Sequence, residues 1–359
     1  MALTLDTLFN DVNIIKVVID RVMQSKLDTI YWQRYLSFEE TKARVFKQFA
    51  GIVTGVTAGS VIGKNSNKPL RERSTLGSGY GEVAFLGDRY QLDNDRLDFL
   101  AELINKYNAA GSADQQRIAN EIVAYIFDDY RQVVLAPHKR MDIVVGDLVS
   151  TGKASVKLAD NPQGIELIDI ELPVHKITPV VGDKANFLTY LKEQLAKLET
   201  TIGAFVTMEM SLATFTKAVL GSSEFKDTYK MILGTAHFDT AAGLLTDTMA
   251  NQVLTAVGLP NIRLVQDHVQ LEDGSLKKIF ADNRIALLQS ENIGKMMWHK
   301  PYEATDPVPN KSYSNLSGGQ WISSERDKEG RYLEYGCEWI PNIVAPQKHV
   351  ILDLDVMLA

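Results

Sequence analysis

Glycine-rich strings are the segments of this sequence whose residue types could hold a nucleotide phosphate. Leu316-Ser317-Gly318-Gly319-Gln320 spells the signature of ATP-binding-cassette proteins. That signature works only opposite a phosphate-binding loop and ahead of a strand that ends in acidic residues, and the sequence shows neither companion. We therefore interpret this string as loop chemistry, in which Gly and Ser favour turns.

Two further strings fail on their spacing. Gly59–Lys64 resembles a phosphate-binding loop, but only three residues separate its glycines where four are needed, and Asn65 takes the place of the magnesium-binding Ser or Thr. Gly77–Val83 is similar to the glycine-rich loop of kinases, yet its third glycine comes one residue early and the chain has no His-Arg-Asp or Asp-Phe-Gly string. Neither string predicts nucleotide binding.

Histidine, serine and cysteine form no catalytic or metal-binding pattern. No two histidines are spaced as His-x-x-x-His, so we expect core or partly exposed side chains at His138, His175, His237, His268, His299 and His349. Gly221-Ser222-Ser223 lacks the spacing of a nucleophile elbow. Cys337 is the only cysteine, which excludes an intrachain disulfide and argues against a thiolate zinc site. We expect no enzyme activity, no metal and no cofactor.

Composition and charge narrow the class of protein. The chain has 359 residues, of which 45% are apolar and 23% charged, enough for one elaborate domain or two ordinary ones. A formal net charge of -7 argues against general wrapping of nucleic acid, since such binding depends on Lys and Arg. No apolar run reaches the roughly 18 residues that a membrane span needs, and Met1–Asp6 carries no basic cluster. We expect a cytoplasmic product without a signal peptide or membrane segment.

The first half of the chain alternates helical and glycine-rich patterns. Apolar residues at helical spacing predict an amphipathic N-terminal helix, and they are Leu8, Val12, Ile15, Val18, Ile19 and Val22. Eight glycines between Phe46 and Tyr90 predict a long two-stranded loop. Helical periodicity returns at 93–107 and again at 118–148, where Pro137 should kink the helix and Gly152 should end it.

The second half predicts a mixed α/β region. Strands are expected at 154–158 and 165–172, and again at 203–208, 262–271, 276–280 and 284–288, with a turn at Asp273-Gly274. Helices are expected at 187–198, at 211–219 with Ser211 as the cap, and at 240–257. Residues 301–330 are rich in Pro, Ser, Asn and Gly and predict a loop. Strand patterns at 331–339 and 350–357 close the chain.

This order of parts resembles the lambda-type branch of the tailed-bacteriophage major capsid proteins, which have the α+β Hong Kong 97 fold. Phe38–Gly51 looks like the point where an N-terminal arm enters an extended loop. Asn283–Leu288 followed by Gly294, and Asp353–Ala359 after Ala345-Pro346, resemble the closing strands of that family. The resemblance spans nearly the whole chain.

The family's domains can be carried onto this sequence. The resemblance implies an N-terminal arm at 1–48, an E-loop at 49–92, a P-domain with a long spine helix at 93–172, an A-domain at 173–340 and a closing strand segment at 341–359. The spine itself would cover about 113–149. The apolar stripe of the arm would then be partly buried against other subunits.

The resemblance implies a shell protein, not an enzyme. The chain would self-assemble into hexamers and pentamers of an icosahedral virion capsid around double-stranded DNA, which it would contact without sequence specificity. Assembly in the host bacterial cytoplasm would use a separate scaffolding protein and a portal protein, with a decoration protein as a further candidate partner. Two alternatives stay open: an encapsulin-type nanocompartment shell, and a soluble α/β enzyme with an unrecognised site.

Two groups of opposite charge suggest a contact between subunits. Lys64, Lys68, Arg71 and Arg73 concentrate positive charge in the expected E-loop. Negative charge gathers near the start and middle of the expected spine, at Asp93, Asp95, Asp98, Asp128 and Asp129. An isolated exposed pair contributes only about 0–1 kcal/mol, so solvated charge is the simpler interpretation. In the family's geometry the loop covers a neighbour, and we hypothesise a charge match that guides assembly.

Overall fold

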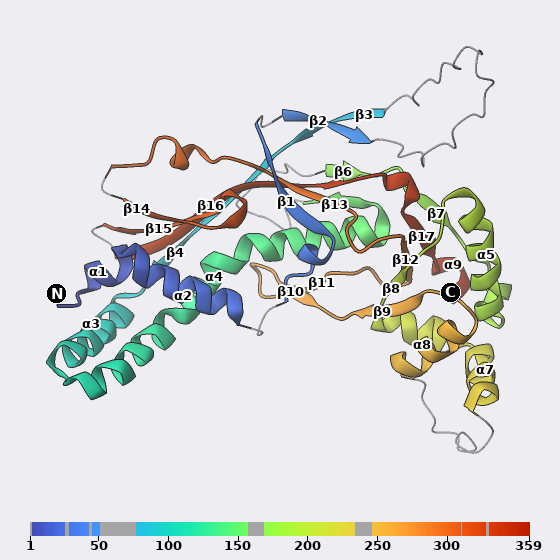
Figure 1. Ribbon diagram of the computed structural model, residues 1–359, viewed down its shortest axis with the longest axis horizontal. Helices are drawn as coiled ribbons and strands as arrows, with labels where there is room; N and C mark the ends of the chain where they lie inside the picture. The colour runs from blue at the N-terminus through green and yellow to red at the C-terminus, as the bar shows by residue number, and fades with distance from the viewer. Residues whose placement is uncertain are drawn as a thin grey trace, which may run out of the picture. The chain divides into compact units, whose positions relative to one another are not determined.

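The computed structural model describes residues 2–25, 29–42, 45–50, 77–156, 169–233, 246–309, 311–327 and 330–359 (Figure 1). The chain divides into two compact units. Unit 1 comprises Met1–Phe46, Gly81–Asp142 and Lys295–Pro341. Unit 2 comprises Lys47–Tyr80, Ile143–Gly294 and Asn342–Ala359. Each unit is therefore assembled from segments far apart in the sequence.

Helices occur in both units. Their bounds are α1 (Leu5–Asn10), α2 (Val12–Gln24), α3 (Asn94–Ala109), α4 (Ser112–Thr151), α5 (Phe187–Thr201), α6 (Leu212–Thr214), α7 (Ser223–Leu233), α8 (Asp247–Ala256) and α9 (Asp355–Leu358). A π-helical turn at Phe215–Val219 continues α6. The expected cap is present, because Ser211 Oγ accepts the N–H of Thr214.

The strands are mostly short, with one long exception. Their bounds are β1 (Leu36–Thr41), β2 (Val45–Ala50), β3 (Gly77–Glu82), β4 (Ala84–Leu92), β5 (Lys153–Ser155), β6 (Asp169–Glu171), β7 (His175–Ile177), β8 (Thr207–Ser211), β9 (Asn261–Val265), β10 (His268–Gln270), β11 (Leu276–Lys278), β12 (Arg284–Leu288), β13 (Gly294–His299), β14 (Ser312–Asn315), β15 (Trp321–Arg326), β16 (Arg331–Ile343) and β17 (Val350–Asp353). The 13-residue β16 is the longest of them.

Unit 1 is organised around β16. The order β1-β13-β16-β15-β14 forms its sheet, and β4 also pairs with β16. In the antiparallel β4 ladder, Ala84 faces Trp339 and Leu92 faces Arg331. Apolar residues of α1, α2, α3, α4 and this sheet make one buried core. Burial of that apolar surface is the main term that holds the unit together.

The N-terminal arm packs differently from the expectation. Its apolar stripe lies in the core of its own unit, with Phe9 and Ile19 beside Leu8, Ile15, Val18 and Val22. α1 contacts α3, and α2 contacts β14. The expectation that this stripe is buried partly against other subunits is therefore wrong. A period of 3.6 identifies an apolar face but does not identify the surface that covers it.

α4 confirms the expected long helix and contains Pro137. Proline has no N–H, so the carbonyl of Val133, four residues earlier, loses its helical donor. The buried Gln320 side chain replaces it, because Nε2 donates to Val133 O at 3.2 Å and to Val134 O at 3.0 Å. Gly152 ends the helix at φ 77°, the left-handed conformation that glycine tolerates.

Gln320→Ala should lower the free energy of unfolding by about 2–3 kcal/mol, because it strands a buried carbonyl without a donor. Chemical denaturation measures this directly. Pro137→Ala supplies a backbone N–H to Val133 O, so the double variant Pro137→Ala/Gln320→Ala should lose clearly less than Gln320→Ala alone. Equal losses of unfolding free energy in the single and double variants would mean that the hydrogen bond from Gln320 to Val133 O does not stabilise the protein.

The string around Gln320 forms a packed turn. Gly318 and Gly319 have φ values of 73° and 69°. A Cβ atom on Gly318 would lie 2.3 Å from the Phe38 ring, and one on Gly319 would lie 2.5 Å from Trp298. The indole of Trp339 donates to the carbonyl oxygen of Gly318 at 2.6 Å. Glycine is needed here for close approach, and the resemblance to a nucleotide-protein signature comes from this turn.

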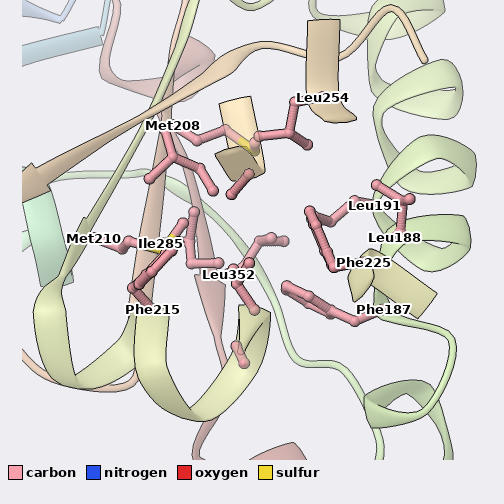
Figure 2. Close-up of a cluster of buried hydrophobic side chains, with 14 of the residues drawn as sticks. Phe187, Leu188, Leu191, Met208, Met210, Phe215, Phe225, Leu254, Ile285 and Leu352 are labelled. Atoms are coloured by element: carbon pink, nitrogen blue, oxygen red, sulfur yellow. The ribbon is translucent and has the colours of Figure 1, made fainter. Parts of the chain in front are cut away.

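Unit 2 holds a five-stranded sheet in the order β7-β17-β12-β8-β9. Strand β12 pairs antiparallel with both β8 and β17, while β8 with β9 and β17 with β7 are parallel. Figure 2 shows residues of its core, where Met208, Met210, Ile285 and Leu352 of the sheet share a cluster with α5 and α7 side chains such as Phe225. Of the strings expected to form the closing strands, Arg284–Leu288 and Asp353 lie in this sheet, whereas Gly294 begins β13 of the unit 1 sheet.

Several expected elements differ from those observed. The expected loop at 301–330 contains β14 and β15, which pair with each other in the unit 1 sheet. The expected strand at 262–271 is divided into β9 and β10, and residues 355–358 form α9 where a strand was expected. β10 and β11 form the expected hairpin, with Gly274 at φ 81° in its turn. α7 had no counterpart in the sequence prediction.

Two expected hairpins are described only at their bases. β2 pairs with β3, and β5 pairs antiparallel with β6. The segments 51–76 and 157–168 lie outside the described residues. The range 173–340, expected to be one A-domain, is divided, because residues up to 294 fall in unit 2 and Lys295–Pro341 falls in unit 1. Pairing of β13, β15 and β16 with strands of unit 1 explains this division.

Candidate functional site

An acidic surface at the start of α3 is the part of the predicted charge match that the structure describes. Asp93 caps the helix, and its Oδ1 accepts the N–H of Asp95 at 2.9 Å. Leu100, Leu103 and Ile104 are buried in the unit 1 core, which turns Asp95 and Asp98 toward solvent. Carboxylates in the first turn also favour the helix through its dipole. The local fold therefore presents three exposed acidic side chains together.

One ion pair joins this surface to the middle of α4. The Arg96 guanidinium grips Asp129 through two contacts, Nη1 to Oδ1 at 2.8 Å and Nη2 to Oδ2 at 2.9 Å. Asp128 is exposed beside it. Arg96 lies one residue after Asp95, so the pair brings the two acidic groups of the sequence next to one another. Two parallel contacts of this kind hold both side chains in one orientation and also pair their charges.

Asp129 differs from the other predicted site residues because it already has a partner in its own subunit. Its pKa is raised above the usual value, since burial outweighs the opposing effect of Arg96, and Asp128 raises it further. Because Arg96 already neutralises much of its charge, Asp129 is less available for an ion pair with another chain. The acidic groups that remain exposed are Asp93, Asp95, Asp98 and Asp128.

Aromatic side chains accompany these acids. The rings of Phe99 and Tyr125 lie 4.9 Å apart, and the Arg96 guanidinium carbon is 5.4 Å from the Tyr125 ring. Phe99 is 43% exposed, although it is large and apolar. Exposed aromatic residues are common in binding surfaces. The sequence prediction missed Arg96, Phe99 and Tyr125, and a cation inside the acidic run Asp93–Asp98 was the available signal.

The other predicted half of the charge match is basic. Lys64, Lys68, Arg71 and Arg73 lie outside the described residues. The acidic surface itself consists of exposed carboxylates on α3 and α4, beside the exposed ring of Phe99. What it offers is a charged contact surface with an aromatic centre.

Histidine, cysteine and carboxylate side chains do not form a metal site in the described part of the chain. No three His, Cys, Asp or Glu side chains converge there as metal ligands. None of the helices described combines the length and apolarity that crossing a membrane requires. Ser222 is buried, and its hydroxyl donates to the carbonyl oxygen of Ala185 at 3.4 Å, a contact that places no base beside it.

Comparison with known proteins was informative at the level of structure only. No protein-family model and no curated protein matches the chain. A protein assigned as the capsid protein of an E. coli CFT073 prophage has a TM-score of 0.55 at 13% identity, with 96% of this chain and 99% of that chain covered.

Two other solved structures match over similar lengths. A phage-related protein of Bordetella bronchiseptica RB50 has a TM-score of 0.49 at 10% identity, with 96% of this chain and 97% of that chain covered. The satellite phage P4 procapsid, solved with its size determination protein, has a TM-score of 0.44 at 11% identity, over 94% and 98%.

The prophage match extends over both units and both chains almost completely. The chain has the Hong Kong 97 fold. The α+β class and the Hong Kong 97 fold that the order of elements predicts are confirmed. At 13% identity the match establishes the path of the chain and leaves the function to be argued separately.

Proposed function

We propose that this protein is the major capsid protein of a tailed bacteriophage, which self-assembles into the icosahedral shell around the phage genome. The match to the prophage capsid protein over nearly all of both chains carries this proposal. The encapsulin-type shell and the soluble enzyme are the outcomes that the experiments below would distinguish.

The same proposal assigns partners and a location. The subunit forms hexamers and pentamers of the virion capsid, assembles in the host cytoplasm and encloses double-stranded DNA that it binds without sequence specificity. A scaffolding protein, a portal protein and a decoration protein are its proposed partners. Its net charge of -7 suits a shell that surrounds DNA without condensing it.

Domain names follow from the fold as part of the proposal. The arm is proposed at 1–48, the E-loop at 49–92 and the P-domain at 93–172, with α4 as the spine helix. The A-domain is proposed to begin at residue 173, and its sheet is that of unit 2. The strands of 295–341 lie in unit 1 with α3, so we now propose that they extend the P-domain.

Size-exclusion chromatography with light scattering tests the proposal on the purified chain. A shell protein is expected to elute as capsomers or particles, with a mass that rises with concentration. A soluble enzyme is expected to elute as a small oligomer at every concentration. Particles that contain a co-purified enzyme cargo and no phage DNA would instead support the encapsulin-type shell.

We further propose that residues 64–73 of one subunit contact the acidic surface of another. Four cations and one acid give this segment a net charge of +3 in an otherwise acidic chain, counted as 4 minus 1. The exposed carboxylates of α3 and α4 supply the opposite charge, and a small energy per contact becomes large when it is repeated around a shell. Asp129 contributes less than its neighbours, because Arg96 already holds it.

Reversal of both Arg71 and Arg73 to Glu should prevent shells or make them dissociate at lower salt, while the melting temperature of the subunit stays nearly constant. Lys192→Glu/Lys197→Glu on α5 makes the same change in net charge elsewhere and should assemble normally. Asp95→Lys/Asp128→Lys should partly rescue the reversal. Lysine at position 129 is unsuitable, because it would face Arg96 within its own subunit. Unaltered shells at low and high salt would reduce the cluster to ordinary surface charge.

A further inference from the structure

The root of the N-terminal arm lies against α4. Tyr31, Trp32 and Tyr35 are buried in the segment that joins α2 to β1. The Trp32 ring stacks on His138 of α4, with centroids 5.7 Å apart and planes 7° from parallel. This aromatic packing holds the side chains of the root, while its backbone needs polar partners in a dry environment.

One carboxylate supplies those partners. Asp142 is fully buried, and its Oδ1 accepts the backbone N–H of Trp32 at 2.9 Å. The backbone N–H of Tyr31 also interacts with this carboxyl group. Lys139, one turn earlier on α4, lies 3.6 Å from Asp142 Oδ2 and donates to the carbonyl oxygen of Thr29 at 2.6 Å. Asp142 and Lys139 of α4 therefore bind backbone groups of residues 29, 31 and 32.

Charge at this joint is poorly compensated. Asp142 Oδ2 lies 3.6 Å from Lys139 Nζ, which is long for a hydrogen bond, and it has no other hydrogen-bond partner among the described residues. The facing cation is Lys139, whose ammonium is shared with Thr29. The other titratable groups around the joint are His138, Tyr31, Tyr35 and Arg34, whose guanidinium carbon lies 5.7 Å from the Tyr31 ring. A buried carboxylate with a single, shared ion partner is costly to keep ionised.

The direction of its titration follows from burial. Burial raises the pKa of Asp142 to about 7, against the opposing effects of the Trp32 N–H, Lys139 and the Tyr31 N–H. His138 does not titrate in the same range, because burial and Lys139 lower its pKa to about 3. Between pH 4 and 7 the closed joint therefore holds a proton that an opened, hydrated Asp142 would release.

We propose that Asp142 is a proton-dependent fastening between the arm root and α4, closed most firmly in acid and opening more readily as the pH rises to neutrality. An open state binds fewer protons than the closed state across this window, so each pH unit should favour opening about tenfold. The effect should level off above pH 7, where both states are ionised. It is a property of the single subunit and does not require that shells form.

Hydrogen exchange of the Trp32 backbone amide in the full-length chain tests this fastening between pH 5 and 7. Base-catalysed exchange alone should rise about tenfold per pH unit when opening is independent of pH. In the wild type the two effects multiply, so the rate should rise about a hundredfold per unit. Asp142→Asn keeps a neutral acceptor for the Trp32 N–H and should return the slope to about tenfold.

Two controls separate the joint from general unfolding. The amide of Leu195, buried in α5 of unit 2, should show the tenfold slope in both proteins. Lys139→Gln removes the facing cation and should extend the steep range above pH 7. A tenfold slope at Trp32 in the wild type, or a hundredfold slope retained in Asp142→Asn, would overturn the proposal. If Asp142→Asn does not fold, the Lys139→Gln variant alone decides the question. A steep range that does not extend above pH 7 in that variant would then overturn the proposal.

Discussion

Ile122→Asp in α4 should abolish soluble expression of the protein. Ile122 is 2% exposed and belongs to the apolar core of unit 1. An aspartate there would bury an unpaired carboxylate and remove a large apolar group, at a cost of about 4 kcal/mol or more. That is a large part of the roughly 5–15 kcal/mol by which a folded domain is stable. Val144→Asp, at an equally buried site in unit 2, should have the same effect.

Asn120→Asp is the matched control for this prediction. Residue 120 lies on the same helix and is exposed, so the same charge should leave expression and melting temperature nearly unchanged. Soluble fractions from parallel expressions, compared by electrophoresis, measure the difference. Soluble Ile122→Asp that still unfolds cooperatively at the wild-type temperature would contradict the packing of α4.

Deletion of residues 2–25, which removes α1 and α2, should unfold unit 1. Six buried apolar side chains would be lost from its core, Leu8, Phe9, Ile15, Val18, Ile19 and Val22. At roughly 1.5–3 kcal/mol for each side chain, the loss would equal or exceed the stability of a typical domain. Circular dichroism melts and limited proteolysis of the truncated chain would detect the collapse.

An exposed pair on α2 provides the control for the deletion. Val17→Ser and Met23→Ser change side chains that are 60% and 43% exposed, so the melting temperature should hardly move. A truncated chain that melts at the wild-type temperature would show that the arm is dispensable for its own unit. That result would restore the expectation of an arm buried against neighbours.

Local patterns in the sequence predicted much of the secondary structure. The apolar stripe from Ile118 to Leu148 gave the position and phase of α4, and Gly152 gave its end, because both signals act within one helix. The helix cap at Ser211 and the turn at Asp273-Gly274 also depend only on residues that are close in sequence. The order of such elements was sufficient to indicate the Hong Kong 97 fold, which the match to the prophage protein confirms.

Long-range pairing was the part that the sequence could not predict. Residues 312–326 are rich in Ser and Gly and show no alternating apolar pattern, so they were predicted as a loop, although β15 pairs with β14 and β16 in the sheet. Gln320 donates a hydrogen bond to the carbonyl of Val133, which has no helical donor because Pro137 lacks an N–H. Gln320 follows that proline by 183 residues, counted as 320 minus 137. The arm and the Asp142 joint are likewise contacts between segments about 110 residues apart.

The candidate site was predicted in part. Asp95, Asp98 and Asp128 are exposed as a charge cluster requires, but Asp129 is held by Arg96, and no periodicity reveals a cross-helix ion pair. Phe99 occupies a face of α3 that its amphipathic pattern assigns to solvent. Its contact with Tyr125 on another helix, in contrast, can be recognised only after the helices have been packed.

Electron microscopy of the purified chain, incubated at rising protein concentration, tests the central claim most directly. A capsid subunit should form closed or partly closed shells, or capsomers with five-fold or six-fold symmetry, and co-expression with a scaffolding protein should make the shells uniform. A homogeneous population of small, compact oligomers at every concentration, with or without such a partner, would contradict the proposal that this protein builds a shell.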